Sequence, residues 1–139
     1  MAAYLGVDGA AGPIDLPANR MAALRALERK VLWLSTWMIH HANHIRPSRD
    51  GLKVGGHQAS SASVATMMTA LYFDVLRPQD RVAVKPHASP VFHAIQYLLG
   101  NQSPERLEWF RGFQGAQSYP SRTKAVSYTH LTLPTNREV

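Results

Sequence analysis

The stretch of sequence that decides the expected fold is Asp80-Arg-Val-Ala-Val-Lys-Pro-His-Ala-Ser-Pro-Val-Phe-His-Ala-Ile-Gln-Tyr-Leu-Leu-Gly100. Its beginning, 80–84, is a short β-branched run bounded by prolines, which predicts a strand. A helix is expected next, because Ser89 is a favourable N-cap, Pro90 suits the first helical position and Gly100 suits a C-terminal cap. Strand, tight loop and helix form half of a βαβ unit, so the sequence predicts the α/β class.

A long helix is expected upstream, beginning after Asp15 and Pro17 and ending near Ile45, since Pro47 disfavours helical geometry at the residue before it. One apolar stripe runs along this helix at steps of three and four residues, which indicates packing against a core. The residues of the stripe are Leu24, Leu27, Val31, Leu34 and Met38.

Two more helices are expected on either side of this unit. The sequence from Ser60 onward, SSASVATMMTALYF, is dense in small residues and predicts a tightly packed helix. Ser103-Pro-Glu105 repeats the start signal of a helix, which is expected to continue to about Phe110.

The two ends of the chain differ in character from the middle. Residues 1–16 are rich in glycine and other small residues, which predicts a flexible arm. Residues 125–139, AVSYTHLTLPTNREV, resemble the translated sequence of a sequencing-library adapter, so they are expected to be a non-native tail. Residues 17–124 are then expected to be the N-terminal part of one domain.

Composition excludes several classes of protein. The chain of 139 residues has no cysteine, which excludes a disulfide framework, a thiolate nucleophile and a sulfur-based metal site, and fits a cytoplasmic location. No apolar run is long enough to span a bilayer, so no membrane association is expected. The formal net charge is +6, but the basic residues are spread along the chain without interleaved aromatic residues, which argues against nucleic acid as a partner.

His57 and His87 are the histidines most favoured as site residues. His57 follows two glycines and precedes the helix expected from Ser60, next to exposed amide donors. His87 follows the expected strand, and ligands of open α/β sheets bind beyond the carboxyl ends of parallel strands. Each alone is as well explained by a ring satisfied by backbone groups, but two such junctions together favour a site.

The other histidines are better explained structurally. His40 and His44 share a helix face, but His41 stands where a zinc protease has glutamate, and no third ligand stands out. We therefore expect no metal site in this chain. His93 lies within the helix after Ser89 and is expected to serve packing.

Four segments agree in order and approximate spacing with those of a known family. They are Val54-Gly-Gly-His57 with Ser60-Ser61, Lys85-Pro-His-Ala-Ser-Pro90, Trp109-Phe-Arg111 and Gln117-Ser-Tyr-Pro120. In these segments the stretch from about Leu24 to Lys124 resembles the N-terminal region of the homodimeric pyruvate dehydrogenase E1 component and, more distantly, transketolase. The resemblance implies an incomplete, doubly wound thiamine-diphosphate-binding fold, of which this helix-rich part forms the N-terminal fragment.

The resemblance also implies roles for particular residues. His57 and His87 would be catalytic and would line the active site over the thiazolium ring, and Ser89 would join them in contacting the cofactor. The thiazolium C2 carbanion adds to a ketone carbonyl, and this reaction needs hydrogen-bond donors and proton transfer, which imidazoles supply. The Gly-Asp-Gly…Asn motif that holds Mg²⁺ and diphosphate is absent, so the isolated fragment is expected to be inactive.

The full-length parent would then use thiamine diphosphate and Mg²⁺, decarboxylate a 2-oxo acid such as pyruvate, and pass the acyl group to a lipoyl-bearing acyltransferase. It would be a homodimer. Two alternatives stay open: a transketolase that transfers ketol groups between sugar phosphates, and a basic helical module that binds nucleic acid or protein. The sequence Gly-Gly-His57-Gln-Ala favours the E1 branch, because a transketolase more often has Ser-Gly-His-Pro-Gly.

Overall fold

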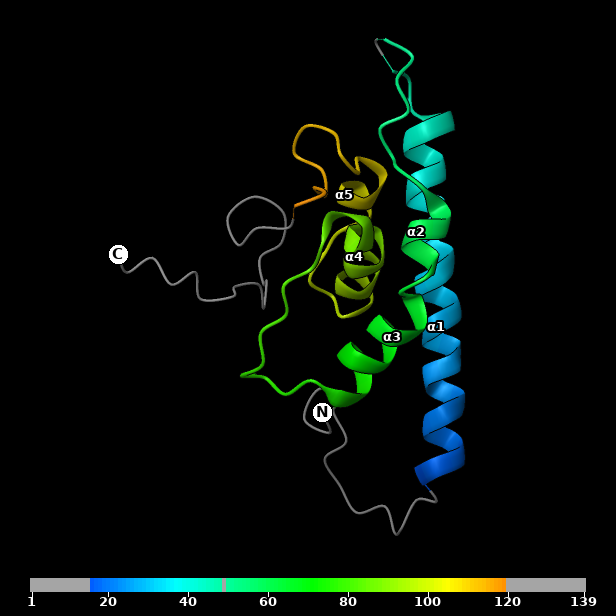
Figure 1. Cartoon of the computed structure of the whole chain (residues 1–139), viewed down its shortest axis with the longest axis vertical. Coiled ribbons are helices and arrows are strands. Elements are labelled where there is room, and N and C mark those ends of the chain that lie inside the picture. Colours follow the sequence, from blue (N-terminus) through cyan, green and yellow to red (C-terminus); the bar gives the residue numbers. More distant parts are fainter. Residues whose placement is uncertain (1–15, 49, 120–139) are drawn as a thin grey trace, which may run out of the picture.

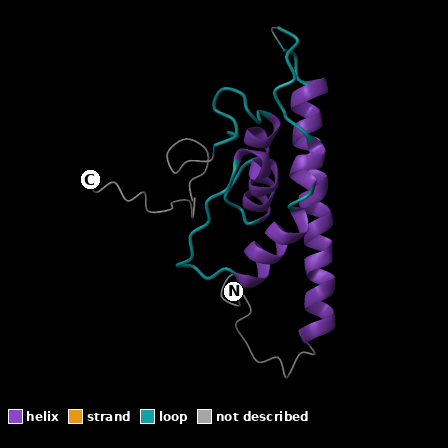
Figure 2. Cartoon of the chain, viewed as in Figure 1, coloured by secondary structure: helices purple, strands orange, loops and turns teal. Residues whose placement is uncertain are grey.

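The computed structural model describes residues 16–48 and 50–119. Within these ranges the chain forms helices joined by loops and turns, and no strand (Figures 1 and 2). The expected non-native tail, and all but the last residue of the expected N-terminal arm, lie outside the described residues. The α/β class stays a prediction, because a doubly wound sheet would need further strands from a longer parent.

The long N-terminal helix forms as predicted. It consists of α1 (Leu16–His40) and a terminal π-turn, η2 (His41–Ile45). Val31 and Met38 of the apolar stripe are fully buried, while Leu24, Leu27 and Leu34 pack partly buried against the core. The helix ends at Ile45, because Arg46 takes an extended conformation with ψ of 128° before Pro47.

The small-residue segment is helical but divided in two. It contains α2 (Gln58–Ala62), α3 (Ala65–Ala70) and a second π-turn, η3 (Leu71–Val75). The division falls at Val64, whose φ of −109° and ψ of 1° are not helical. Both α2 and α3 pack against α1, and α3 leads the chain away from it (Figure 1).

The strand predicted over 80–84 is wrong for the described chain. These residues have no regular secondary structure, although the alternation that suggested a strand is real. Val82 and Val84 pack against the core, whereas Arg81 and Ala83 are exposed. A strand also needs hydrogen bonds to a partner strand, and the described residues supply none.

The helix after this segment forms with one change at its start. A 3₁₀ turn, η4 (Pro86–Ala88), precedes α4 (Ser89–Leu98), so Ala88 is the N-cap and Ser89 already lies inside the helix. The prediction of Ser89 as the cap is therefore wrong by one residue. The C-terminal prediction is confirmed: Gly100 has φ of +78°, and its N–H donates to Tyr97 while that of Asn101 donates to Gln96, which is a Schellman motif.

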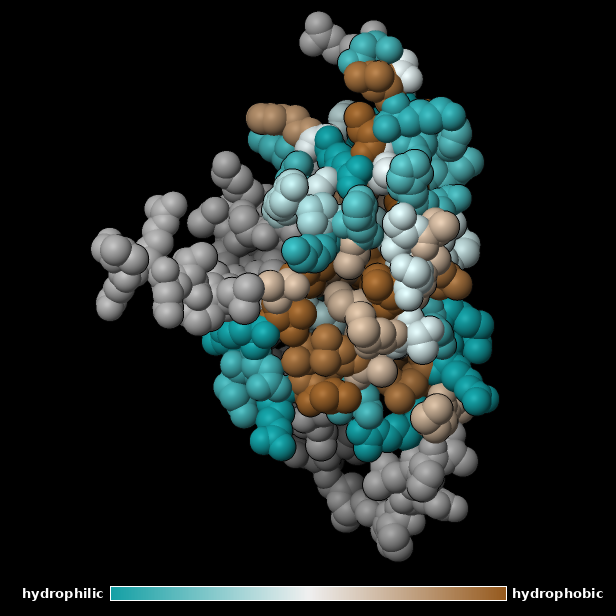
Figure 3. Space-filling view, in the orientation of Figure 1, coloured by the Kyte–Doolittle hydropathy of each residue, from teal (hydrophilic) through white to brown (hydrophobic). Residues whose placement is uncertain are grey.

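The core lies around α4. Residues 89–96 of this helix are all buried, because α1, α2, α3 and α5 (Pro104–Glu108) pack around it. Ser103 is the N-cap of α5 as predicted, although the helix ends two residues before Phe110. Apolar side chains also gather on the face of the molecule seen in Figure 3, flanked by hydrophilic ones.

Candidate functional site

The loop before His57 is held by side chains from two distant segments. The Gly55 N–H donates to the Asn43 Oδ1 at 2.6 Å, and the Asn43 Nδ2 donates to the Gly56 carbonyl at 3.0 Å. From the other side, the Arg111 Nη1 donates to the Val54 carbonyl at 2.7 Å. The loop backbone is thus fixed between η2 and the turn after α5.

The structure brings the segments of the two predicted catalytic histidines together. His57 is the N-cap of α2, in an extended conformation, and α2 packs against η4, which contains His87. Both histidines are exposed. Among the described residues, neither imidazole has a hydrogen-bond partner.

Ser89, the third predicted site residue, is fully buried. Its hydroxyl donates to the Pro86 carbonyl at 2.7 Å and so closes the turn that contains His87. Its role towards a cofactor stays a prediction. Nearby, Ser61 of α2 is buried, and its hydroxyl has no partner in the described part of the chain.

His93 lies in the core, in agreement with its expected structural role. Its Nε2 is 2.8 Å from the Gln117 carbonyl, which can only accept, so Nε2 carries the proton. Its Nδ1 then accepts from the Gln102 amide nitrogen at 3.0 Å. Burial lowers the pKa of His93 to about 4, partly opposed by the hydrogen bond to Gln117. The ring is therefore neutral at physiological pH.

The histidine pair on the first helix is exposed. The ring centroids of His40 and His44 are 5.0 Å apart. Within residues 16–48 and 50–119, no group of three or more histidine, cysteine or acidic residues is placed to hold a metal ion. A pair without a third ligand gives no reason to assign metal binding there.

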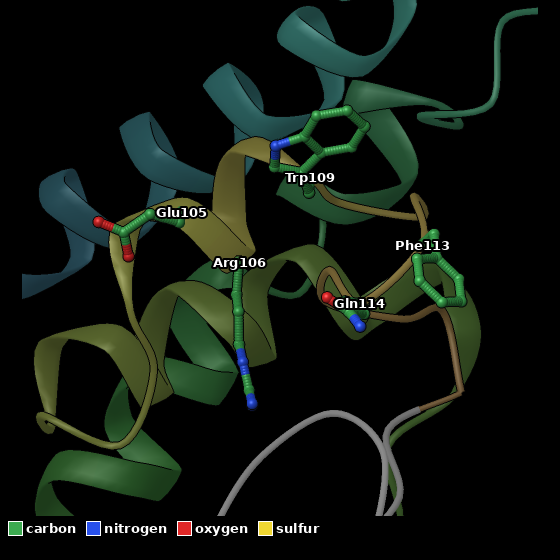
Figure 4. A pocket seen from close by; sticks show the side chains of 5 residues that line it. All are labelled: Glu105, Arg106, Trp109, Phe113 and Gln114. Atoms are coloured by element: carbon green, nitrogen blue, oxygen red, sulfur yellow. The ribbon is translucent and has the colours of Figure 1, made fainter.

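None of the predicted site residues lines the pocket in Figure 4. It has a volume of about 510 Å³ and is lined by Glu105, Arg106, Trp109, Phe113 and Gln114. Hydrogen bonding from the Ser103 side chain lowers the pKa of Glu105. Glu105 is therefore ionised at neutral pH and is unsuited to donate a proton.

Sequence reasoning missed the residues that hold the candidate site. The sequence pattern places Asn43 only at a helix end, and it places Arg111 only in a family motif without a role. Arg46 was also missed; its Nη1 donates to the Phe110 carbonyl at 2.9 Å and its guanidinium lies 5.6 Å from the centre of the Trp109 ring. A signal for Asn43 exists, because asparagine is a poor helix former and often bonds to backbone groups.

Comparison with known proteins gives two similar relatives. The chain is 31% identical over 101 residues to the pyruvate dehydrogenase E1 components of Mycolicibacterium smegmatis and Mycobacterium tuberculosis. Each match covers 65% of this chain, and the chain spans about one tenth of the length of these relatives, 10% in both cases. The similarity supports an origin in that enzyme family and gives transketolase no specific support.

No family model matches the chain, and no solved structure matches it. In the part that the structure describes, no helix is both long enough and apolar enough to cross a membrane.

Proposed function

We propose that this chain is an N-terminal segment of a thiamine-diphosphate-dependent 2-oxo acid dehydrogenase E1 component. The observation that carries the proposal is the contact between α2, which His57 caps, and the η4 turn, which contains His87. Two accessible imidazoles on adjoining segments suit a reaction that needs both hydrogen-bond donors and proton transfer. The two mycobacterial E1 components support the family.

The proposed parent decarboxylates pyruvate and transfers the acyl group to a lipoyl-bearing acyltransferase. Thiamine diphosphate, when bound, supplies the carbanion that attacks the keto group and the electron sink for decarboxylation. In this chain, His57 and His87 would hydrogen-bond the substrate oxygen and move protons to and from it. Ser89 would support the His87 turn through its bond to Pro86.

The residues present do not fit the diphosphate and its Mg²⁺. The described residues contain no group of three or more metal-ligating side chains, and the sequence has no Gly-Asp-Gly…Asn motif. We therefore assign no anchoring role to this chain and propose that it is inactive alone. Homodimerisation and a cytoplasmic location belong to the same proposal for the parent.

The test uses the parent enzyme recovered by extending the reading frame past residue 124. His57→Ala and His87→Ala should each lower pyruvate oxidation, followed with an artificial electron acceptor, by about 100-fold or more. The thermal midpoint should barely change, because both side chains are exposed. His44→Ala, at another exposed histidine, is the matched control and should keep full turnover.

Two results would contradict the proposal. Unchanged turnover in both histidine variants would remove the site assignment. A parent that transfers ketol groups from xylulose 5-phosphate and ignores pyruvate would be a transketolase.

A further inference from the structure

We infer that Asn43 and Arg111 are positioning residues, which together set the backbone before His57 and thereby the place of its imidazole. Three successive residues each have one backbone group bonded to one of these two side chains: the Val54 carbonyl, the Gly55 N–H and the Gly56 carbonyl. The inference rests on the proposed function in so far as His57 is catalytic.

The loop is in direct contact with the end of the first helix. A Cβ at Gly55 would lie 2.5 Å from the Ile39 carbonyl oxygen and 2.8 Å from the Asn43 Oδ1. Because the first of these atoms is backbone, it has little freedom to move away. Position 55 must therefore be glycine for the Asn43 bonds to form in this geometry.

Asn43 forms hydrogen bonds through both the oxygen and the nitrogen of its side-chain amide. Its oxygen accepts from Gly55 and its nitrogen donates to Gly56, so the side chain continues the hydrogen-bond pattern of the backbone. Aspartate could accept from Gly55 but could not donate to Gly56, and alanine could do neither. Aspartate therefore removes the Gly56 bond alone, and alanine removes both bonds together.

Arg111 covers the loop from the opposite side. Its own backbone has φ of +59°, an uncommon conformation for a residue with a side chain, and its N–H donates to the Ala116 carbonyl at 2.7 Å. The guanidinium lies 5.1 Å from the centre of the Phe110 ring, and a Cβ at Gly56 would meet its Nη1 at 3.0 Å. The contacts with Phe110 and Gly56 thus hold the Arg111 guanidinium in the position from which it donates to the Val54 carbonyl.

The consequence is a histidine with a fixed backbone and an exposed ring that has no partner among the described residues. α2 begins at the next residue and packs against η4, so any shift of the loop would be passed to the spacing between His57 and His87. A bond network that ends one residue before a catalytic group is the arrangement that holds such a group within the small tolerance of a reaction.

The experiment has two arms. In the isolated chain, Asn43→Ala should raise the exchange rate of the Gly55 amide hydrogen by about tenfold, because the acceptor of that amide is removed. The HN–Hα coupling of His57, which reports its φ of −106°, should move towards a conformational average. Asn43→Asp should keep the Gly55 protection, and Asn101→Ala, which removes an amide bonded to the Gln96 side chain elsewhere, should change neither.

In the parent enzyme, Asn43→Ala and Arg111→Ala should lower kcat by about tenfold or more while KM for pyruvate changes little. Arg111→Lys should recover part of kcat, since lysine can still donate to Val54. Arg81→Ala is the control, because this guanidinium donates to the Pro78 and Gln79 carbonyls in another loop. If Asn43→Ala fails to fold, Asn43→Asp and Arg111→Lys carry the test.

Each failure points to one claim. Unchanged Gly55 exchange in Asn43→Ala would overturn the positioning inference whatever the enzyme does. So would full kcat in the Asn43 and Arg111 variants of a parent in which His57→Ala is impaired. A wild-type parent without pyruvate oxidation would instead overturn the proposed function.

Discussion

His93 shows what a buried titratable residue does to stability. Its pKa is about 4 in the folded chain and ordinarily 6.5, because burial disfavours the charged ring. Between these pH values the unfolded chain binds a proton that the folded chain does not. The free energy of unfolding should therefore fall as the pH drops from 6.5 to 4, by about 3 kcal/mol from this residue.

The prediction is tested with His93→Gln, which lacks a titrating ring and can still donate to the Gln117 carbonyl. Urea unfolding at about pH 7 and about pH 4.5 should show a smaller acid loss in the variant than in the wild type. The difference between the two proteins is needed, because hydrogen bonding lowers the pKa of Asp50 and Glu105, whose contributions are also lost in acid. Equal losses would mean that folding does not lower the pKa of His93.

Residues whose role depends on near neighbours were predictable from sequence. Gly100 follows a local rule of backbone conformation and lies where that rule predicts, whereas Pro90 is the second helical residue and not the first. Asn43 and Arg111 were not predictable in this way, because their partners lie 12, 13 and 57 residues away. The position of His57 at a helix start was local and could be predicted, but the groups that hold it were not.

Among the helices, α4 has the greatest share of the core. Phe92 is fully buried there, and its ring centroid lies 6.0 Å from that of Tyr72 and 5.4 Å from that of His93. Phe113, which lies after α5, has 87% of its surface exposed. Phe92 and Phe113 have the same side chain and differ in burial, so comparing their substitutions isolates the effect of burial on stability.

Phe92→Ala should lower the free energy of unfolding by about 3–5 kcal/mol, since it removes buried apolar surface and leaves a cavity. Phe113→Ala should change it by less than about 0.5 kcal/mol. Chemical denaturation monitored by circular dichroism measures both. Similar losses in the two variants would show that α4 is not the centre of the core.

In the segment 80–84, the alternation of apolar and polar residues is not sufficient to predict a strand. The alternation of apolar and polar residues correctly indicates that Val82 and Val84 face the core. It cannot indicate hydrogen bonding, because a strand is a property of two segments and the sequence pattern describes one.

Several large apolar side chains in the described part of the chain are exposed to solvent. Trp33 is 63% exposed although it stacks on Trp37 at a centroid distance of 6.3 Å, and Met67 is 61% exposed. Contiguous exposed apolar surface, where such side chains adjoin, is typical of a face that another chain or domain covers. Such coverage agrees with the proposal of a longer parent.

The isolated chain should therefore self-associate. Sedimentation velocity should show a weight-average sedimentation coefficient that rises with protein concentration, despite a net charge of +6. Trp33→Ser and Phe113→Ser, combined in one protein, should weaken this dependence. A concentration-independent monomer in the wild type would contradict the prediction.

Because of the π-turn η2, the number of residues at the end of the first helix sets how the following part of the chain is rotated about the helix axis. The closing bond of this turn runs from the Arg46 N–H to the His41 carbonyl, five residues apart, whereas an α-helical turn spans four. Deleting one residue between 41 and 45 would restore ordinary helical spacing and rotate the next part of the chain by about 100° around the axis. A deletion at His41 or Ala42 would therefore turn Asn43 away from Gly55 and Gly56, whose backbone groups its amide binds.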